Sequence, residues 1–155
     1  MASPSRITVP AFAERKSSAQ KLCMLTAYDF PTAQLLDQSG VDAILVGDSL
    51  ANVVQGRETT IPVTLDEIIY HAEIVCRAVE HALVVVDMPF LSYHTGIEQA
   101  IANAGRILKQ TGCQAVKLEG NAGQAAIVSS LVDIGIPVMA HVGLRPQSIH
   151  QMGGY

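Results

Sequence analysis

Five short apolar runs, separated by stretches with helical periodicity, constrain the fold of this chain more than any other feature. A near-continuous apolar run is typical of a strand that is buried on both faces of a parallel sheet. Strands that alternate with helices predict a parallel sheet with right-handed crossovers. We therefore expect an α/β fold in which residues 1–155 form one domain. The runs cover residues 21–27, 42–46, 82–86, 114–119 and 137–140.

Capping signals mark where the predicted helices begin. Asp29 is expected to cap the helix after the first strand, and Asn121 the helix after the fourth. Thr64 and Thr95 are each followed three residues later by a glutamate, which is the spacing of a capping box. A loop over residues 50–63 separates the second strand from its helix, and loops of this length often have a function.

Two architectures agree with this alternation: an open doubly wound sheet and a TIM (β/α)8 barrel. The first strand is not followed by G-x-G-x-x-G, and there is no P-loop motif, so the usual nucleotide arguments for an open sheet are missing. Polar residues follow several strands in turn. A barrel gathers all its strand ends at one mouth, whereas an open sheet gathers them only at a switch point. We therefore predict about the first five β/α units of a TIM barrel.

Composition and charge exclude several classes of protein. The net charge is −4 and no run of Lys or Arg occurs, which argues against binding to nucleic acid or to an anionic membrane. No apolar run reaches the length of a membrane span, and the N-terminus lacks a secretory signal. Cys23, Cys76 and Cys113 form no C-x-x-C pair and lie in apolar segments, so we expect reduced core residues of a cytoplasmic protein.

Three acidic residues, Asp48, Asp87 and Glu119, lie at the ends of three different predicted strands. In a barrel these ends converge, and carboxylates that share a site repel one another unless a proton or a cation neutralises them. Mg²⁺ suits one or two direct carboxylates together with waters and substrate oxygens. A simpler alternative stays open for Asp48, because an aspartate after a strand also serves to cap or turn the chain.

Further polar residues surround these carboxylates. Lys117 and Glu119 are two apart on one strand, so both face the same side of the sheet. Lys117 fits equally a structural ion pair and a cation for a substrate carboxylate or a developing oxyanion. Ser49 either binds a substrate carboxylate or caps the turn, and His141, at the end of the fifth strand, is more often structural than catalytic. The residues alone predict a Mg²⁺-dependent enzyme that forms an enolate of a small anionic substrate.

Several segments closely resemble ketopantoate hydroxymethyltransferase, also called 3-methyl-2-oxobutanoate hydroxymethyltransferase. The resemblance runs in order from about residue 20 to the end of the chain, with sensible spacing. Because it depends on several independent motifs, it is much more specific than any one of them. The segments are MLTAYD (24–29), VGDSLANVVQGRETTIPVTLDEIIYH (46–71), DMPFLSYHT (87–95), AVKLEG (115–120) and HVGLRPQSIHQMGGY (141–155).

This resemblance implies a (β/α)8 barrel of the phosphoenolpyruvate/pyruvate superfamily. It implies transfer of a hydroxymethyl group from 5,10-methylenetetrahydrofolate to 3-methyl-2-oxobutanoate, which gives 2-dehydropantoate for pantothenate and coenzyme A synthesis. Members of the family are cytosolic and form large homo-oligomers, typically decamers. The resemblance assigns Mg²⁺ to Asp48, Asp87 and Glu119. It assigns the keto acid to Asp48, Ser49, Asp87 and Lys117, with His141 beside it.

Two rival functions remain. One is a carbon–carbon lyase of the isocitrate lyase type, although the K-K-C-G-H signature of those enzymes is missing from this chain. The other is a truncated, inactive relative that binds a keto acid or acts as an assembly partner. The second rival draws support from length, because family members are considerably longer and contain further strands.

The family's general base is a glutamate on a later strand, and no residue up to Tyr155 matches it. We therefore predict a fragment or truncated product, without a catalytic residue of its own and with at most feeble turnover. A turnover assay with the keto acid, Mg²⁺ and methylenetetrahydrofolate checks this. Rates equal to those of full-length family members would show the prediction to be wrong.

Overall fold

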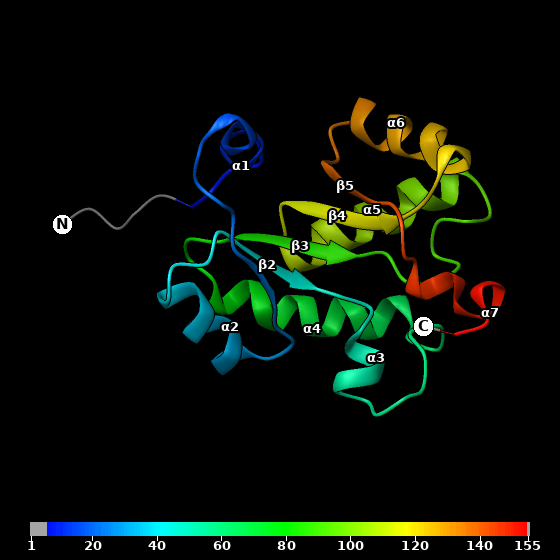
Figure 1. The fold of residues 1–155 in the computed structure, drawn as a ribbon, viewed down its shortest axis with the longest axis horizontal. Helices are drawn as coiled ribbons and strands as arrows, with labels where there is room; N and C mark the ends of the chain where they lie inside the picture. Colours follow the sequence, from blue (N-terminus) through cyan, green and yellow to red (C-terminus); the bar gives the residue numbers. More distant parts are fainter. Residues whose placement is uncertain (1–5, 155) are drawn as a thin grey trace.

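Five parallel strands lie side by side in chain order in the computed structural model, which describes residues 6–154 (Figure 1). Strand neighbours in the sheet are therefore also neighbours along the chain. This order is that of a barrel, whereas a doubly wound sheet reverses direction at a switch point. The predicted strands are confirmed within a few residues. Their bounds are β1 Met24–Thr26, β2 Ala43–Val46, β3 Leu83–Asp87, β4 Ala115–Glu119 and β5 Val138–His141.

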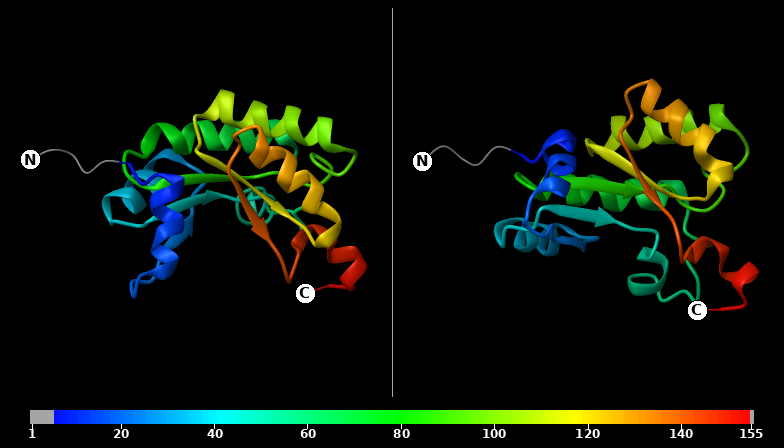
Figure 2. Two further views of the ribbon diagram at one scale, coloured as in Figure 1. Left: turned by 90° about the horizontal axis from the view of Figure 1, so that it is seen from above. Right: turned by 45° about the horizontal axis from the view of Figure 1, so that its top comes forward.

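The longer helices cover one face of the curved sheet, and the short helix near the N-terminus lies against the other (Figure 2). Within residues 6–154, no helix is both long and apolar enough to cross a membrane. The α-helices are α1 Val9–Glu14, α2 Phe30–Gln38, α3 Leu50–Val53, α4 Leu65–Ala78, α5 Ile97–Thr111, α6 Ala125–Asp133 and α7 Ile149–Met152. The 3₁₀ helices are η1 Arg15–Ser17, η2 Ala122–Gln124 and η3 Pro146–Ser148.

Side chains alternate between the two faces of the sheet. Ile44 and Val84 belong to the main core, beneath the helices on the convex face. Val85 belongs to a smaller apolar cluster on the concave face, which includes Val9 and Phe12 at helix α1. Because successive residues of a strand face opposite sides, the odd-numbered residues of β3, β4 and β5 share the concave face.

Most of the predicted helix starts are confirmed. The Asp29 side chain accepts a hydrogen bond from the backbone N–H of Thr32 at 2.8 Å and caps α2. Thr64 and Glu67 form both halves of the capping box at α4. Asn121 caps the η2 turn, which leads directly into α6. Local sequence signals therefore suffice at these three helix starts.

Two local predictions are wrong. Thr95 and Glu98 do not form a capping box, because helix α5 starts after Gly96, which has a φ of 145° and provides no side chain. The hydroxyl of Thr95 instead donates to the side-chain oxygen of Gln99 at 2.6 Å. The expected loop over 50–63 begins with a helical turn, α3, directly after the second strand.

The cysteine prediction is correct only in part. All three thiols are free, and Cys113 is buried while Cys76 is half-buried. Cys23, which was expected in the core, is exposed. It directly precedes β1, a strand of three residues at the edge of the sheet, where little of the chain covers it.

A buried carboxylate anchors the start of β3. Asp37, on α2, has only 5% of its surface exposed. Its Oδ2 accepts the backbone N–H of Glu80 at 2.9 Å, and its Oδ1 accepts that of Ala82 at 2.7 Å. The backbone N–H of His81 also donates to this carboxylate, at 3.2 Å. One side chain thus satisfies three consecutive donors that lead into β3.

We expect the substitution Asp37→Ala to lower the free energy of unfolding by about 3 kcal/mol, because buried N–H donors lose a charged acceptor. Urea denaturation followed by circular dichroism measures the change. The exposed Asp133, substituted in the same way, is the control and should shift stability by less than about 0.5 kcal/mol. Equal effects of the two substitutions would contradict the anchoring role.

Candidate functional site

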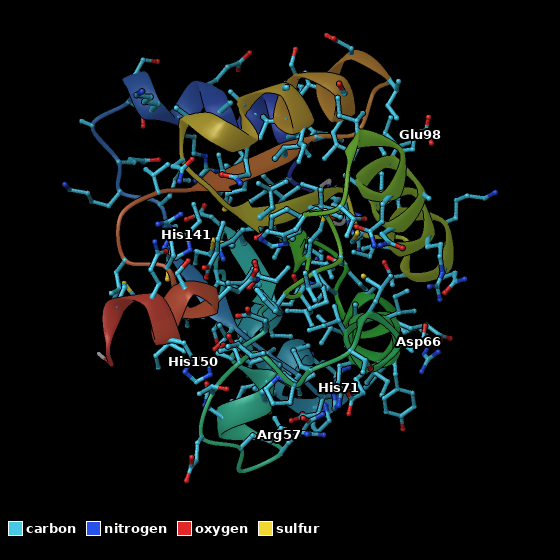
Figure 3. All side chains as sticks on the ribbon, turned by 90° about the vertical axis from the view of Figure 1, so that its right-hand side faces the viewer. Arg57, Asp66, His71, Glu98, His141 and His150 are labelled. Atoms are coloured by element: carbon cyan, nitrogen blue, oxygen red, sulfur yellow. The ribbon has the colours of Figure 1, made fainter. Side chains whose placement is uncertain are left out.

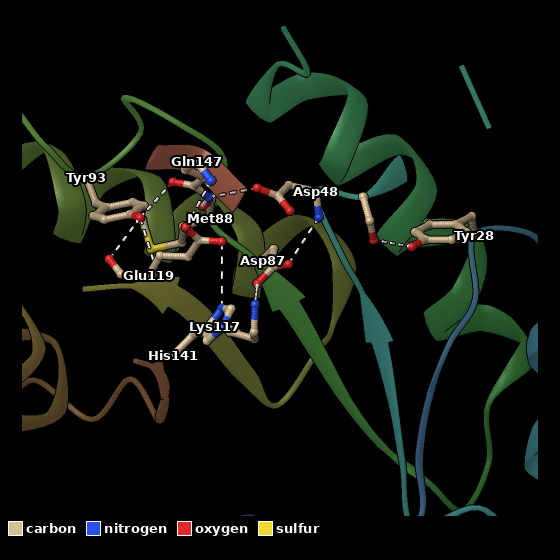
Figure 4. Close-up of polar contacts among 10 residues, drawn as sticks. Tyr28, Asp48, Asp87, Met88, Tyr93, Lys117, Glu119, His141 and Gln147 are labelled. Atoms are coloured by element: carbon tan, nitrogen blue, oxygen red, sulfur yellow. Dashed lines mark hydrogen bonds and ion pairs between the residues drawn. The ribbon is translucent and has the colours of Figure 1, made fainter. Parts of the chain in front are cut away.

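The strand register brings the predicted site residues to one end of the sheet. Asp87 pairs with Lys117 across β3 and β4, and Glu119 pairs with His141 across β4 and β5. All four are odd-numbered residues, so they share the concave face. Asp87, Glu119 and His141 end their strands, and Lys117 lies two residues before the end of β4. Figure 3 looks onto the side of the molecule where His141 lies near α7, and Figure 4 shows the contacts among these side chains.

Asp87 is held by two donors from neighbouring strands. The ammonium of Lys117 lies 2.7 Å from its Oδ1, and the backbone N–H of Asp48 donates to its Oδ2 at 3.1 Å. The close approach depends on Gly47, because a Cβ there would lie 3.3 Å from Asp87 Oδ2 and 3.0 Å from the hydroxyl of Ser49. The glycine directly after β2 thus lets this segment approach the end of β3 closely.

Asp48 does not act as a simple cap. Its carbonyl accepts the N–H of Ala51 in the α3 turn, but its side chain bonds elsewhere. Oδ2 of Asp48 accepts the side-chain N–H of Gln147 at 2.8 Å. Gln147 also donates its backbone N–H to Oε2 of Glu119 at 3.0 Å. The segment that follows β5 therefore connects two of the three predicted carboxylates (Figure 4).

Sequence reasoning missed Gln147 and Tyr93, which complete this network. The Tyr93 hydroxyl donates to the side-chain oxygen of Gln147 at 2.8 Å, and both residues are buried. Gln147 meets Asp48 across 99 residues of chain, so neither residue shows a local pattern that identifies it. The only available signal was that both lie in segments that resemble the family, after the third and fifth strands.

The site buries more negative charge than its lysine balances. Burial raises the pKa of Asp87 to about 6, although the charge of Lys117 acts in the opposite direction. Burial raises the pKa of Glu119 to about 7, opposed by the hydrogen bond from Gln147. The charge of Asp48 raises both pKa values further. A bound cation would stabilise the ionised form of these groups.

Ser49 and His141 lie at the edge of this cluster. The hydroxyls of Ser49 and Tyr28 are 2.6 Å apart, and Ser49 makes no capping hydrogen bond to α3. Nδ1 of His141 lies 3.7 Å from Oε1 of Glu119 and is buried without a hydrogen bond to any described residue. Burial, together with the charge of Lys117, lowers the pKa of His141.

The donor set suits a hard divalent cation, but a complete ligand cage is not preformed. Among residues 6–154, no three His, Cys, Asp or Glu side chains form a group that could hold a metal ion. Neighbours occupy several of the carboxylate oxygens: Gln147 binds Asp48 and Glu119, and Lys117 binds Asp87. The arrangement fits an ion such as Mg²⁺, which takes one or two carboxylates and completes its shell with water and substrate.

Comparison with protein families gives a match over almost the whole chain. The profile of the ketopantoate hydroxymethyltransferase family matches residues 6–155. The chain is 54% identical to 3-methyl-2-oxobutanoate hydroxymethyltransferase from Rhodopirellula baltica, over 97% of this chain and 56% of that protein. It is 58% identical to the enzyme of that name from Trichodesmium erythraeum, over 96% of this chain and 57% of that protein. The chain spans about half the length of the curated relatives it matches.

Solved structures share the fold at low sequence identity. A 2,3-dimethylmalate lyase of the PEP mutase/isocitrate lyase superfamily matches with a TM-score of 0.61 and 19% identity, over 96% of this chain and 56% of that chain. A phosphonopyruvate hydrolase in complex with oxalate and Mg²⁺ matches with a TM-score of 0.66 and 11% identity, over 96% of this chain and 56% of that chain. The predicted fold, about the first five β/α units of a barrel, is confirmed.

We expect Lys117→Met to lower the free energy of unfolding by about 3 kcal/mol at neutral pH, because Asp87 loses its buried partner. Adding Asp87→Asn should recover part of this loss, since no uncompensated charge remains. Urea denaturation of the two single variants and the double variant measures the coupling.

The exposed Lys109 on α5, substituted in the same way, controls for the general loss of a lysine. Additive effects of Lys117→Met and Asp87→Asn would show that the pair seen in the structure does not contribute to stability.

Proposed function

Because this chain belongs to the ketopantoate hydroxymethyltransferase family, we propose that it carries the Mg²⁺ and keto acid site of such an enzyme. The complete reaction transfers a hydroxymethyl group from 5,10-methylenetetrahydrofolate to 3-methyl-2-oxobutanoate and gives 2-dehydropantoate. The observation that carries the proposal is the row of Asp87, Lys117 and Glu119 on one face and at one end of the sheet. That row lies inside the segments that resemble the family.

Metal binding is supported by the chemistry of the carboxylates. The backbone N–H of Asp48 donates to Oδ2 of Asp87 at 3.1 Å, which brings the two residues together. Lys117 holds the other oxygen of Asp87, and Gln147 holds one oxygen of Asp48. Glu119 extends the same negative region. We assign Asp48 and Asp87 as direct ligands and Glu119 as a ligand either directly or through water. The structurally similar phosphonopyruvate hydrolase, a protein of the same fold, binds oxalate and Mg²⁺.

A keto acid presents a carboxylate and a neighbouring keto oxygen, and the site offers groups that suit both. The ammonium of Lys117 has three N–H donors, and the hydrogen bond to Asp87 uses one of them. The remaining donors suit a substrate oxygen. The hydroxyl of Ser49 lies next to Asp48 in the chain and is held by Tyr28, so it is a second donor for the substrate carboxylate. We place His141 beside the bound acid, next to Glu119.

Enolate formation follows from the proposed binding mode. Bound Mg²⁺ would polarise the keto group and stabilise the negative charge that develops when the neighbouring carbon loses its proton. Lys117 adds a fixed positive charge at the same place, and the buried surroundings strengthen its effect. The residues described here hold the acid and neutralise its charge. The family resemblance assigns removal of the proton to a general base, a glutamate on a later strand of the longer family members.

Three finer features are part of the proposal. The family resemblance supports methylenetetrahydrofolate as the one-carbon donor, a homo-oligomeric assembly and a cytoplasmic location. The resemblance assigns no residue of this chain to folate binding. The activity belongs to the whole enzyme, of whose length this chain spans about half.

We expect 3-methyl-2-oxobutanoate to bind this chain only when Mg²⁺ is present, because the ion links the acid to the carboxylates. Asp87→Asn should weaken binding at least about tenfold, because it removes the negative charge of one ligand of the ion and the charged partner of Lys117. Isothermal titration calorimetry, with and without Mg²⁺, measures both effects.

Asp133→Asn changes an exposed aspartate far from the site and serves as the matched control. Binding that is independent of Mg²⁺, or equal heats for wild type and Asp87→Asn, would contradict the proposed site. Formation of a condensation product from glyoxylate and succinate would favour a carbon–carbon lyase instead.

A further inference from the structure

Gln147 forms hydrogen bonds to four other residues of the site. Its side-chain N–H groups donate to Oδ2 of Asp48 at 2.8 Å and to the carbonyl of Met88 at 3.0 Å. Its side-chain oxygen accepts the hydroxyl of Tyr93 at 2.8 Å, and its backbone N–H donates to Glu119 at 3.0 Å. One residue, in the segment after β5, therefore connects the segments that follow β2 and β3 with the end of β4 (Figure 4).

These partners fix the orientation of the Gln147 amide. Asp48 Oδ2 and the Met88 carbonyl are both acceptors, so the nitrogen of the amide must face them. A flipped amide would place its oxygen against these two acceptors. Tyr93, which is fully buried, supplies the hydroxyl that the amide oxygen requires. Gln147 itself has only 6% of its surface exposed, so water does not compete readily for these bonds.

The fixed amide has a consequence for Asp48. The N–H donor at Oδ2 determines the rotation of the carboxylate group. Oδ1 of Asp48 accepts no hydrogen bond from residues 6–154, so this oxygen keeps its capacity for another ligand. The carboxylate is thus oriented, with one oxygen held by Gln147 and the other available.

We infer that Gln147 is a positioning residue for Asp48: its amide holds Oδ2 and leaves Oδ1 for the divalent cation. The inference rests on the proposed function, because it assumes that Asp48 binds a metal there. Tyr93 supports the arrangement from the other side of the amide. Partners that orient a metal ligand typically contribute about 10- to 100-fold to metal affinity.

A purely structural role would have a different signature. The Gln147 side chain also attaches the η3–α7 segment to Asp48 and to the Met88 carbonyl, so its removal lowers stability in either case. Only the positioning role changes the affinity of the folded protein for a metal. The decisive readout is therefore metal binding under conditions in which every variant is folded, and stability is measured separately.

The experiment compares wild type with Gln147→Met, which keeps the length of the side chain and removes its hydrogen bonds. Mn²⁺ replaces Mg²⁺ as the probe, because electron paramagnetic resonance counts the free ion directly. We expect the Mn²⁺ dissociation constant to rise about 10- to 100-fold in Gln147→Met. Gln151→Met, one turn further on the exposed side of α7, is the matched control and should bind like wild type.

The outcomes separate this inference from the proposed function. If wild type does not bind Mn²⁺, the proposed metal site itself fails. If wild type and Gln147→Met bind Mn²⁺ equally while only stability falls, Gln147 is structural and the inference is wrong. Should Gln147→Met not fold, Tyr93→Phe decides. It removes the donor to the amide oxygen, together with the contacts of the same hydroxyl to the backbone N–H and carbonyl of Glu119. It should weaken Mn²⁺ binding in the same direction by a smaller factor, and unchanged binding would overturn the inference.

Discussion

Burying carboxylates at the end of a parallel sheet is the constraint on which the rest of this site depends. Asp87 and Glu119 end neighbouring strands on the concave face, where burial disfavours their charged forms. Lys117 compensates Asp87 directly, and backbone N–H groups of Asp48 and Gln147 compensate the rest only in part. An arrangement of this kind is costly unless a cation or an anionic substrate with its cation completes it. The residues around the carboxylates are best understood as parts of that compensation.

The sheet supplies the geometry for this arrangement. Five in-order parallel strands place their carboxyl ends together at one end of the sheet, and the longer helices cover the convex face (Figure 2). On the concave face, residues near the strand starts, such as Leu83 and Val85, pack with helix α1, whereas charged residues occupy the strand ends. The same face thus changes from apolar to polar along β3, β4 and β5. This division agrees with a barrel, in which one end serves stability and the other carries the site.

Sequence reasoning recovered the parts of the structure that local patterns determine. Apolar runs located the strands, and period-two alternation correctly placed Lys117 and Glu119 on one side. Caps were predicted where the capping side chain follows the usual spacing, as at Thr64, and failed at Thr95, where a glycine starts the helix. Gln147 was missed because its role depends on a contact across 99 residues. Such contacts are created by the fold, so no window of the sequence contains them. The metal and substrate roles of the site residues stay predictions.

The central claim is that Asp48 and Asp87 hold one divalent ion at which a keto acid binds. The most direct measurement is a crystal structure of this chain with Mn²⁺ and 3-methyl-2-oxobutanoate, in which anomalous scattering locates the ion. Our account predicts a single strong peak at the carboxylates of these two residues, with the oxygens of the acid completing the shell of the ion. A peak elsewhere in the molecule, or an acid bound without an ion beside it, would contradict the account.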